Sequence, residues 1–206
     1  MEMVDWPAVI AVFTVYVAGV VVPGPNFVAV AHKAASTGRT ESLALVAGIV
    51  VVNLFWSTCA ILGVGFVFRA FPILAFVIKM AGAGYLIWFG LRLYTKAGEG
   101  GASRTVTAQT DFKRSFLQGV ATNIANPKSI AFYAAVFASA APAHVSWVTF
   151  GVMVATVGVV ASAWYGLVAV ALSHKGISDA YRKKKRSIDR GSGSLIVLLG
   201  LRQLIR

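Results

Sequence analysis

The chain has 206 residues, of which 58% are hydrophobic and 13% are charged, and its mean hydropathy is +0.76. Soluble domains carry about 25% charged residues, so this composition excludes an ordinary soluble protein. The formal net charge of +12 arises from 19 basic and 7 acidic residues. The basic residues lie between the apolar runs, and we therefore attribute them to membrane topology and anionic lipid rather than to nucleic acid.

Six apolar segments predict an all-α membrane protein with six transmembrane helices, because several reach the roughly 20 residues that cross a bilayer. The last is short and follows the basic run YRKKKRS at 181–187, so five crossings remain an alternative. The N-terminal MEMVDW lacks the basic region of a cleavable signal peptide, which makes the first segment an uncleaved span. The segments are residues 6–31, 43–68, 73–94, 116–140, 145–172 and 192–205.

Two of these segments are interrupted by proline. Helix one is broken at Pro23-Gly24-Pro25, and helix four is broken at Asn126-Pro127-Lys128. Proline inside a helix removes a hydrogen bond and clashes with the preceding turn, at a cost of about 3 kcal/mol. Backbone groups freed at bilayer depth must face protein or water, because lipid cannot satisfy them.

Lysine and arginine are distributed unevenly among the connections. They are abundant in the first, third and fifth connections, whereas the second holds only Arg69 and the fourth holds none. Positively charged loops mark the cytoplasmic side, so six spans would leave both termini on the outer side of the membrane.

The two halves of the chain resemble each other. GAGYLIWFGLRLYTK at 82–96 matches SGSLIVLLGLRQLIR at 192–206, and the two proline breaks lie at similar distances before these stretches. We therefore expect one transporter domain, residues 1–206, built from repeat one (about 1–98) and repeat two (about 112–206). Three spans per repeat would invert the second copy, and matched breaks in inverted repeats indicate a transporter binding site.

The candidate substrate-binding residues follow from the breaks. The half-helix after Pro25 directs its free amides at the break, where a carboxylate is favoured. Lys128 brings a charge into an apolar segment, which indicates function, although snorkelling to an interface is an alternative. Asn53 either lines a cavity or joins two helices. The predicted set is Pro23, Gly24, Pro25, Asn26, Asn53, Asn126, Pro127 and Lys128.

No catalytic, metal or cofactor constellation occurs in the sequence, which predicts that the protein is not an enzyme. All seven acidic residues lie at the termini or in loops, and the lone Cys59 cannot form the thiol pair that relays electrons. The readings that remain are a transporter of amino acids, an efflux transporter of another small metabolite or ion, and an uncoupled channel.

The chain resembles the LysE/RhtB family of bacterial amino-acid exporters over nearly its whole length. The matching stretches are PGPNF at 23–27, Gly38-Arg39 followed by Gly48, GAGYLIWFG at 82–90 and NPKSIAFY at 126–133. The resemblance implies an inner-membrane secondary exporter of amino acids or close derivatives, driven by the proton gradient. Its paired motifs fall on residues 23–26 and 126–128.

The chain departs from this resemblance near the fifth segment. Several relatives carry an aspartate shortly before the aromatic pair, whereas this chain has Ala161 and Ser162 before Trp164 and Tyr165. The departure disfavours a carboxylate proton carrier and a cationic substrate, and it favours homoserine, threonine or another neutral amino acid. A homodimer is compatible with the sequence, which does not set the oligomeric state.

Overall fold

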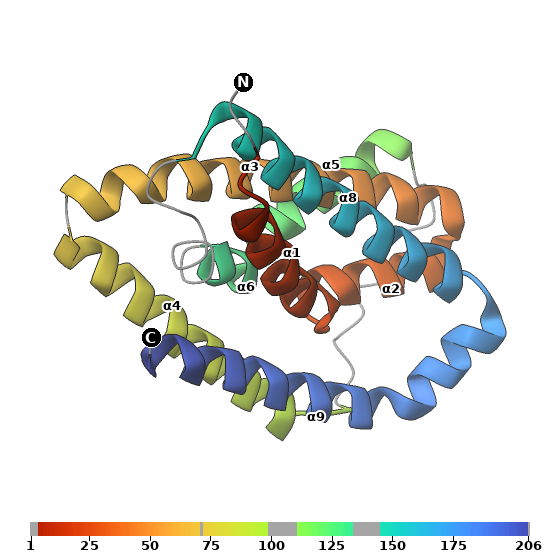
Figure 1. Ribbon diagram of the computed structural model, residues 1–206. Helices are drawn as coiled ribbons and strands as arrows, with labels where there is room; N and C mark the ends of the chain where they lie inside the picture. Colours follow the sequence, from red (N-terminus) through yellow and green to blue (C-terminus); the bar gives the residue numbers. More distant parts are fainter. Residues whose placement is uncertain (1–3, 71, 99–110, 134–144, 206) are drawn as a thin grey trace.

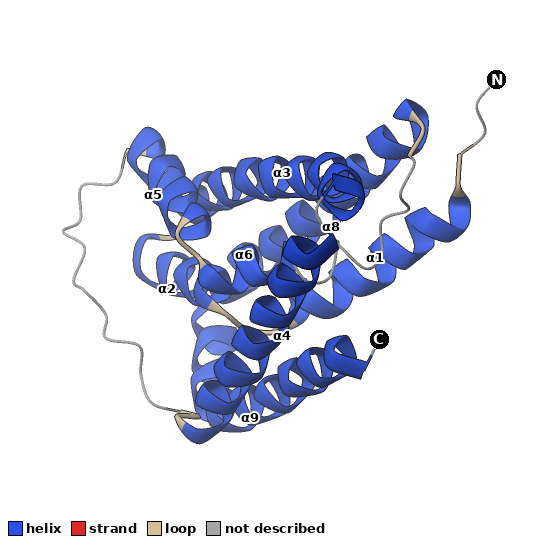
Figure 2. Cartoon of the chain, turned by 90° about the vertical axis from the view of Figure 1, so that its left-hand side faces the viewer, coloured by secondary structure: helices blue, strands red, loops and turns tan. Residues whose placement is uncertain are grey.

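A computed structural model describes residues 4–70, 72–98, 111–133 and 145–205 (Figure 1). Throughout these ranges the regular secondary structure is helical, as Figure 2 shows, so the predicted all-α class is confirmed. The helices are α1 (Trp6–Val21), α2 (Pro25–Thr37), α3 (Arg39–Ala70), α4 (Pro72–Thr95), α5 (Phe112–Ile124), α6 (Pro127–Phe132), α8 (Trp147–Leu172) and α9 (Lys175–Ile205).

The first predicted break separates α1 from α2. The two helices meet at an angle of 55°. Val22 and Gly24 are extended, and Pro25 occupies the first turn of α2, where its missing N–H costs no hydrogen bond. The prolines therefore end one helix and start another within a single predicted segment.

The second predicted break separates α5 from α6. The Asn126 side chain accepts a hydrogen bond from the Lys128 amide at 3.0 Å and caps α6, which begins at Pro127. Asparagine is a preferred residue at this position because its oxygen satisfies a free amide of the first turn. Residues 134–140 of the predicted fourth segment lie outside the described residues.

Two described helices are long and apolar enough to cross a membrane, Arg39–Leu62 within α3 and all of α8. The bent pair of α1 and α2 adds a third candidate if it forms one broken span. These helices coincide with the predicted segments at 43–68, 145–172 and 6–31. The full count of six spans stays a prediction.

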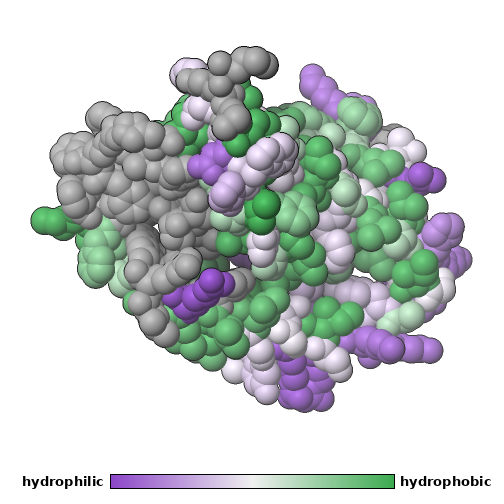
Figure 3. Space-filling view, viewed as in Figure 1, coloured by the Kyte–Doolittle hydropathy of each residue, from purple (hydrophilic) through white to green (hydrophobic). Residues whose placement is uncertain are grey.

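The outer surface is apolar where lipid would contact it. Large hydrophobic side chains that are more than half exposed lie on α1, α3 and α8, among them Ile10, Phe55 and Val159. Figure 3 shows hydrophobic residues across much of one face, with hydrophilic residues gathered near its right-hand and lower edges. Such extensive exposed apolar surface is typical of a membrane-facing protein.

The basic run was expected to form a connection before a short sixth segment, but it is part of a helix. α9 continues for 31 residues without interruption. Lysine and arginine are strong helix formers, and Lys185 pairs with Asp189 one turn later at 2.6 Å. Asp189 also accepts a hydrogen bond from the Gly98 amide at 3.1 Å, which holds this part of α9 to the end of α4.

Helices α4 and α9 lie side by side and run in opposite directions (Figures 1 and 2). A Cβ added to Gly90 would lie 2.7 Å from the Gly193 oxygen, and one added to Gly200 would lie 3.0 Å from the Ala83 oxygen. The glycines thus permit backbone contact between the two stretches whose sequences match, 82–96 and 192–206.

The other helix pairs have defined directions as well. α3 and α5 run parallel, because Gly119 packs on the Leu45 backbone and Asn123 reaches the Ile49 carbonyl one turn further along both helices. α1 and α8 begin at the same end, where the Asp5 amide donates to Thr149 Oγ1 at 3.1 Å.

Candidate functional site

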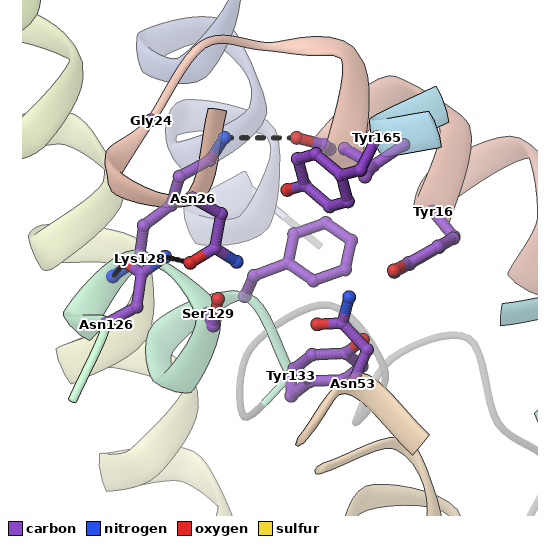
Figure 4. Close-up of a pocket in the computed structure, with 12 residues that line it drawn as sticks. Tyr16, Gly24, Asn26, Asn53, Asn126, Lys128, Ser129, Tyr133 and Tyr165 are labelled. Atoms are coloured by element: carbon purple, nitrogen blue, oxygen red, sulfur yellow. Dashed lines mark hydrogen bonds between the residues drawn. The ribbon is translucent and has the colours of Figure 1, made fainter. Parts of the chain in front are cut away.

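The two helix breaks meet in the interior of the protein. Asn26, in the first turn of α2, and Asn126, which caps α6, are both buried. Asn126 Nδ2 donates to Asn26 Oδ1 at 3.0 Å, as Figure 4 shows. The structure therefore joins two predicted site residues that are 100 positions apart in the chain.

A third asparagine, Asn123 near the end of α5, is the centre of the polar network. Its Oδ1 accepts from Asn26 Nδ2 and from Ser129 Oγ, both at 2.8 Å. Its Nδ2 donates to the Ile49 carbonyl at 2.8 Å and to Asn53 Oδ1 at 2.9 Å. Both hydrogens and both lone pairs of this fully buried amide are thus used.

Sequence reasoning missed Asn123. A signal was available, because Asn123 precedes Asn126 by three residues in the stretch ATNIANPKS, and such polar residues are uncommon inside an apolar segment. In a helix, a residue three positions before Asn126 lies about one turn earlier on the same face, so helical spacing would have placed Asn123 close to the break.

Asn53, from the middle of α3, lies at the edge of this network. Its Oδ1 accepts from Asn123, while its Nδ2 is buried and has no hydrogen-bond partner among the described residues. Leaving a buried donor unpaired is costly, and such groups commonly mark a place where water or a ligand binds. Asn53 therefore fits both interpretations of the sequence, because it joins α3 to α5 and also lines the cavity.

Lys128 reaches from α6 to the end of α1. Its ammonium donates to the Val22 carbonyl at 2.6 Å and to the Gly19 carbonyl at 3.1 Å. The last carbonyls of a helix lack partners and carry partial negative charge, so a cation there is favourable. An ammonium has three N–H groups, and these two bonds use two of them.

Gly24 makes room for this lysine. A Cβ added to Gly24 would lie 2.8 Å from Lys128 Cδ and 3.2 Å from Nζ. The backbone of Gly24 is extended, with φ −148° and ψ −169°, which any residue adopts. The glycine is therefore required for space rather than for an unusual backbone conformation.

A small cavity lies between the breaks, with a volume of about 30 Å³. The predicted residues Gly24, Asn26, Asn53, Asn126 and Lys128 line it. Pro23 and Pro25 are not among its described lining residues; they set the bend, and Pro127 begins α6. The cavity has room for about two water molecules, so an amino acid requires it to widen.

Aromatic side chains form the other wall of the cavity (Figure 4). Tyr16 packs edge-on against Phe132, with ring centroids 6.1 Å apart, and lies 6.3 Å from the Tyr133 ring. Tyr165 of α8 completes the wall. None of these four aromatic residues was in the set of binding residues predicted from the sequence.

The arrangement suits binding rather than covalent chemistry. Amides, backbone carbonyls and one ammonium converge on the cavity, and none of its described lining residues is acidic. Across the part of the chain that the structure covers, no three histidine, cysteine or acidic side chains gather where a metal could bind. Donors for a carboxylate and acceptors for an ammonium therefore lie within one cavity.

Comparison with known proteins gives matches over most of the chain. A family model described as LysE type translocator matches residues 17–206. The threonine efflux protein of Escherichia coli (strain K12) is 28% identical over 199 residues, which covers 95% of this chain and 97% of that protein.

Two further relatives are a homoserine/homoserine lactone efflux protein and an uncharacterized membrane protein. The first, from Salmonella typhimurium, is 33% identical over 146 residues, 67% of each chain. The second, from Haemophilus influenzae, is 25% identical over 191 residues, 90% of each chain. No solved structure gives a significant match.

Proposed function

Because the chain belongs to the LysE type translocator family, we propose that it exports a small neutral amino acid of the threonine or homoserine type. The protein is a multi-pass membrane transporter and not an enzyme. The observation that carries the proposal is the cavity where both helix breaks meet, because it offers hydrogen-bond partners for both charged ends of an amino acid.

The substrate carboxylate would meet the donors of this cavity. Lys128 has one N–H beyond its two bonds to α1, and Asn53 Nδ2 is an unpaired buried donor. A hydrogen bond to an ionised group is worth about 1.5–3 kcal/mol, more than one between neutral groups. These two residues would thus provide much of the affinity for the carboxylate.

The substrate ammonium would meet neutral acceptors and aromatic rings. Asn126 and Asn26 offer amide oxygens, and the faces of Tyr16 and Tyr165 attract a cation. No acidic side chain is present among the described lining residues to bind a second positive charge. This composition supports a neutral substrate over lysine or arginine.

Export would proceed by alternating access, since the cavity is too small for an amino acid as it stands. The directions of the helices support two inverted three-helix repeats. α4 and α9, which hold the matching stretches, run antiparallel, and the parallel pair of α3 and α5 has a counterpart in α1 and α8. Rocking one repeat against the other would separate Asn26 from Asn126.

We further propose that the protein lies in a bacterial inner membrane with both termini outside and that the proton gradient drives export. The distribution of basic residues supports the orientation. Lys128 is the one lining residue of the described cavity with a basic side chain, which makes it the candidate proton carrier.

The test uses the full-length protein in liposomes that are loaded with a mixture of all twenty amino acids and homoserine. We expect threonine and homoserine-like compounds to leave faster than lysine, and a pH gradient to increase the rate. Unlabelled substrate on the far side should stimulate release of labelled substrate. Release without such stimulation would indicate a channel, and preferential release of basic amino acids would refute the proposed substrate class.

A further inference from the structure

A second, larger cavity lies near the start of α9, away from the helix breaks. Its volume is about 240 Å³, and it is formed by α2, the end of α8 and the first turns of α9. Its lining combines apolar, basic and hydroxyl side chains. The residues that matter here are Val28, Leu172, Ser36, Ser178, Arg182 and Lys185.

The position of the cavity relative to a bilayer follows from α8. This helix is one of the candidate membrane spans and ends at Leu172, which lines the cavity. The cavity therefore lies where the hydrocarbon region ends and the lipid headgroups begin. Arg182 and Lys185 line the cavity from α9, whereas Val28 is an exposed apolar residue of α2.

The charge of the cavity is positive. Arg182, Lys185 and His32 line it, and no acidic residue is among its described lining residues. Lys185 is held in place by the buried Asp189 at 2.6 Å, which offsets part of its charge, while Arg182 is exposed. The neighbouring positions 183, 184 and 186 are basic as well, so the local field attracts anions.

The walls of the cavity are fixed by aromatic packing. Tyr181 lies 5.6 Å from the Phe27 ring, and Phe27 lies 6.4 Å from Trp164 of α8. Burial, with a smaller contribution from the Asp189 carboxylate, raises the pKa of Tyr181 to about 12. Tyr181 also lines the cavity.

We propose that this cavity binds an anionic phospholipid. The phosphate would lie against Arg182 and Lys185, with the hydroxyl of Ser178 as a further donor, and an acyl chain would pass Val28 on α2. Basic pockets between helices at the cytoplasmic membrane surface bind lipid headgroups in this way. A lipid here would hold the first turns of α9 against α2, the helix that begins at the break.

The test measures binding of phosphatidylglycerol to the delipidated full-length protein in detergent by native mass spectrometry. Loss of a hydrogen bond to a charged group corresponds to about tenfold or more in affinity, so we expect that loss from Arg182→Gln. Lys184→Gln is the matched control, because it removes the same charge from the same helix outside the cavity. Ala35→Phe keeps every charge but fills the cavity, and it should also weaken binding.

Three results would overturn the proposal. Equal losses from Arg182→Gln and Lys184→Gln would show diffuse attraction to the basic face of α9. Equal binding of phosphatidylcholine would show that the anionic headgroup is not recognised. Displacement of phosphatidylglycerol by millimolar inorganic phosphate would assign the cavity to a free anion. None of these measurements depends on amino-acid export, so they do not bear on the proposed function.

Discussion

The two helix breaks are built differently, although they lie at similar distances before the two stretches that match in sequence. The first break provides mainly backbone: Gly24 has no side chain to cap α2, and α1 ends in carbonyls that have no partner within the helix. The second break provides side chains: Asn126 caps its own helix, and Lys128 satisfies the end of α1. Each break therefore completes the other, and neither forms the cavity alone.

This difference assigns distinct roles to residues that look alike in sequence. Substitutions in the second break should remove polar side chains from the cavity. A larger residue at Gly24 in the first break should instead fill the space that Lys128 occupies. The following substitutions separate the two effects.

The largest effect is expected from Lys128→Ala. The substitution removes the cavity's ammonium and leaves the Gly19 and Val22 carbonyls unpaired. Loss of a buried hydrogen bond to a charged group costs up to about 3 kcal/mol, so export in proteoliposomes should fall about a hundredfold. Lys113→Ala, at an exposed position on α5, is the control and should export normally. Unchanged export by a correctly inserted Lys128→Ala protein would refute the role of this residue.

The next effect is on stability and comes from Asn123→Ala. The substitution removes four hydrogen bonds at once, because Asn26, Asn53, Ser129 and the Ile49 carbonyl each lose the bond that they make with Asn123. We expect a loss of about 2–3 kcal/mol, which lowers the unfolding temperature by roughly 5–10 °C for a chain of this size.

Asn53→Ala is the matched comparison, because it removes only one of the four bonds of Asn123. Thermal unfolding of both variants in the same detergent gives the comparison directly. If Asn53→Ala destabilised the protein as much as Asn123→Ala, then Asn123 would not be the centre of the network.

A smaller effect, on export alone, is expected from Gly24→Ala. The added Cβ would lie 2.8 Å from Lys128 Cδ, so the lysine must move while the backbone stays unstrained. Overpacking of this kind costs about 1–3 kcal/mol, which corresponds to export reduced about tenfold. Gly166→Ala, where a Cβ meets nothing within 4 Å, provides the control. Equal export by both alanine variants would show that Gly24 does not serve Lys128.

The sequence predicted the breaks well, because proline and glycine act locally on the backbone. It placed the interruptions at residues 23–25 and 126–128, and it included Asn26, Asn53 and Asn126, which the structure joins into one network. Partners were harder to predict. The contact of Lys128 with the end of α1 depends on how α6 packs against α1, and no local pattern encodes that packing.

The connection before the sixth segment shows a different limit. Its charges suggested a loop, yet the same lysines and arginines favour helix, and the contact of Asp189 with the Gly98 amide comes from a distant part of the chain. Hydropathy separates apolar from polar stretches, but it does not separate a polar helix from a polar loop.

The central claim is that the two breaks form one site and must separate during export. The most direct test combines Asn26→Cys and Asn126→Cys. Cys59, the only cysteine in the sequence, is replaced by serine so that it cannot cross-link. Export is first measured for Asn26→Cys and for Asn126→Cys separately, which gives the activity that each substitution leaves without a cross-link. We predict that oxidative cross-linking stops the export that the reduced double-cysteine protein retains, and that a reducing agent restores it. Undiminished export by the fully cross-linked protein would contradict the account.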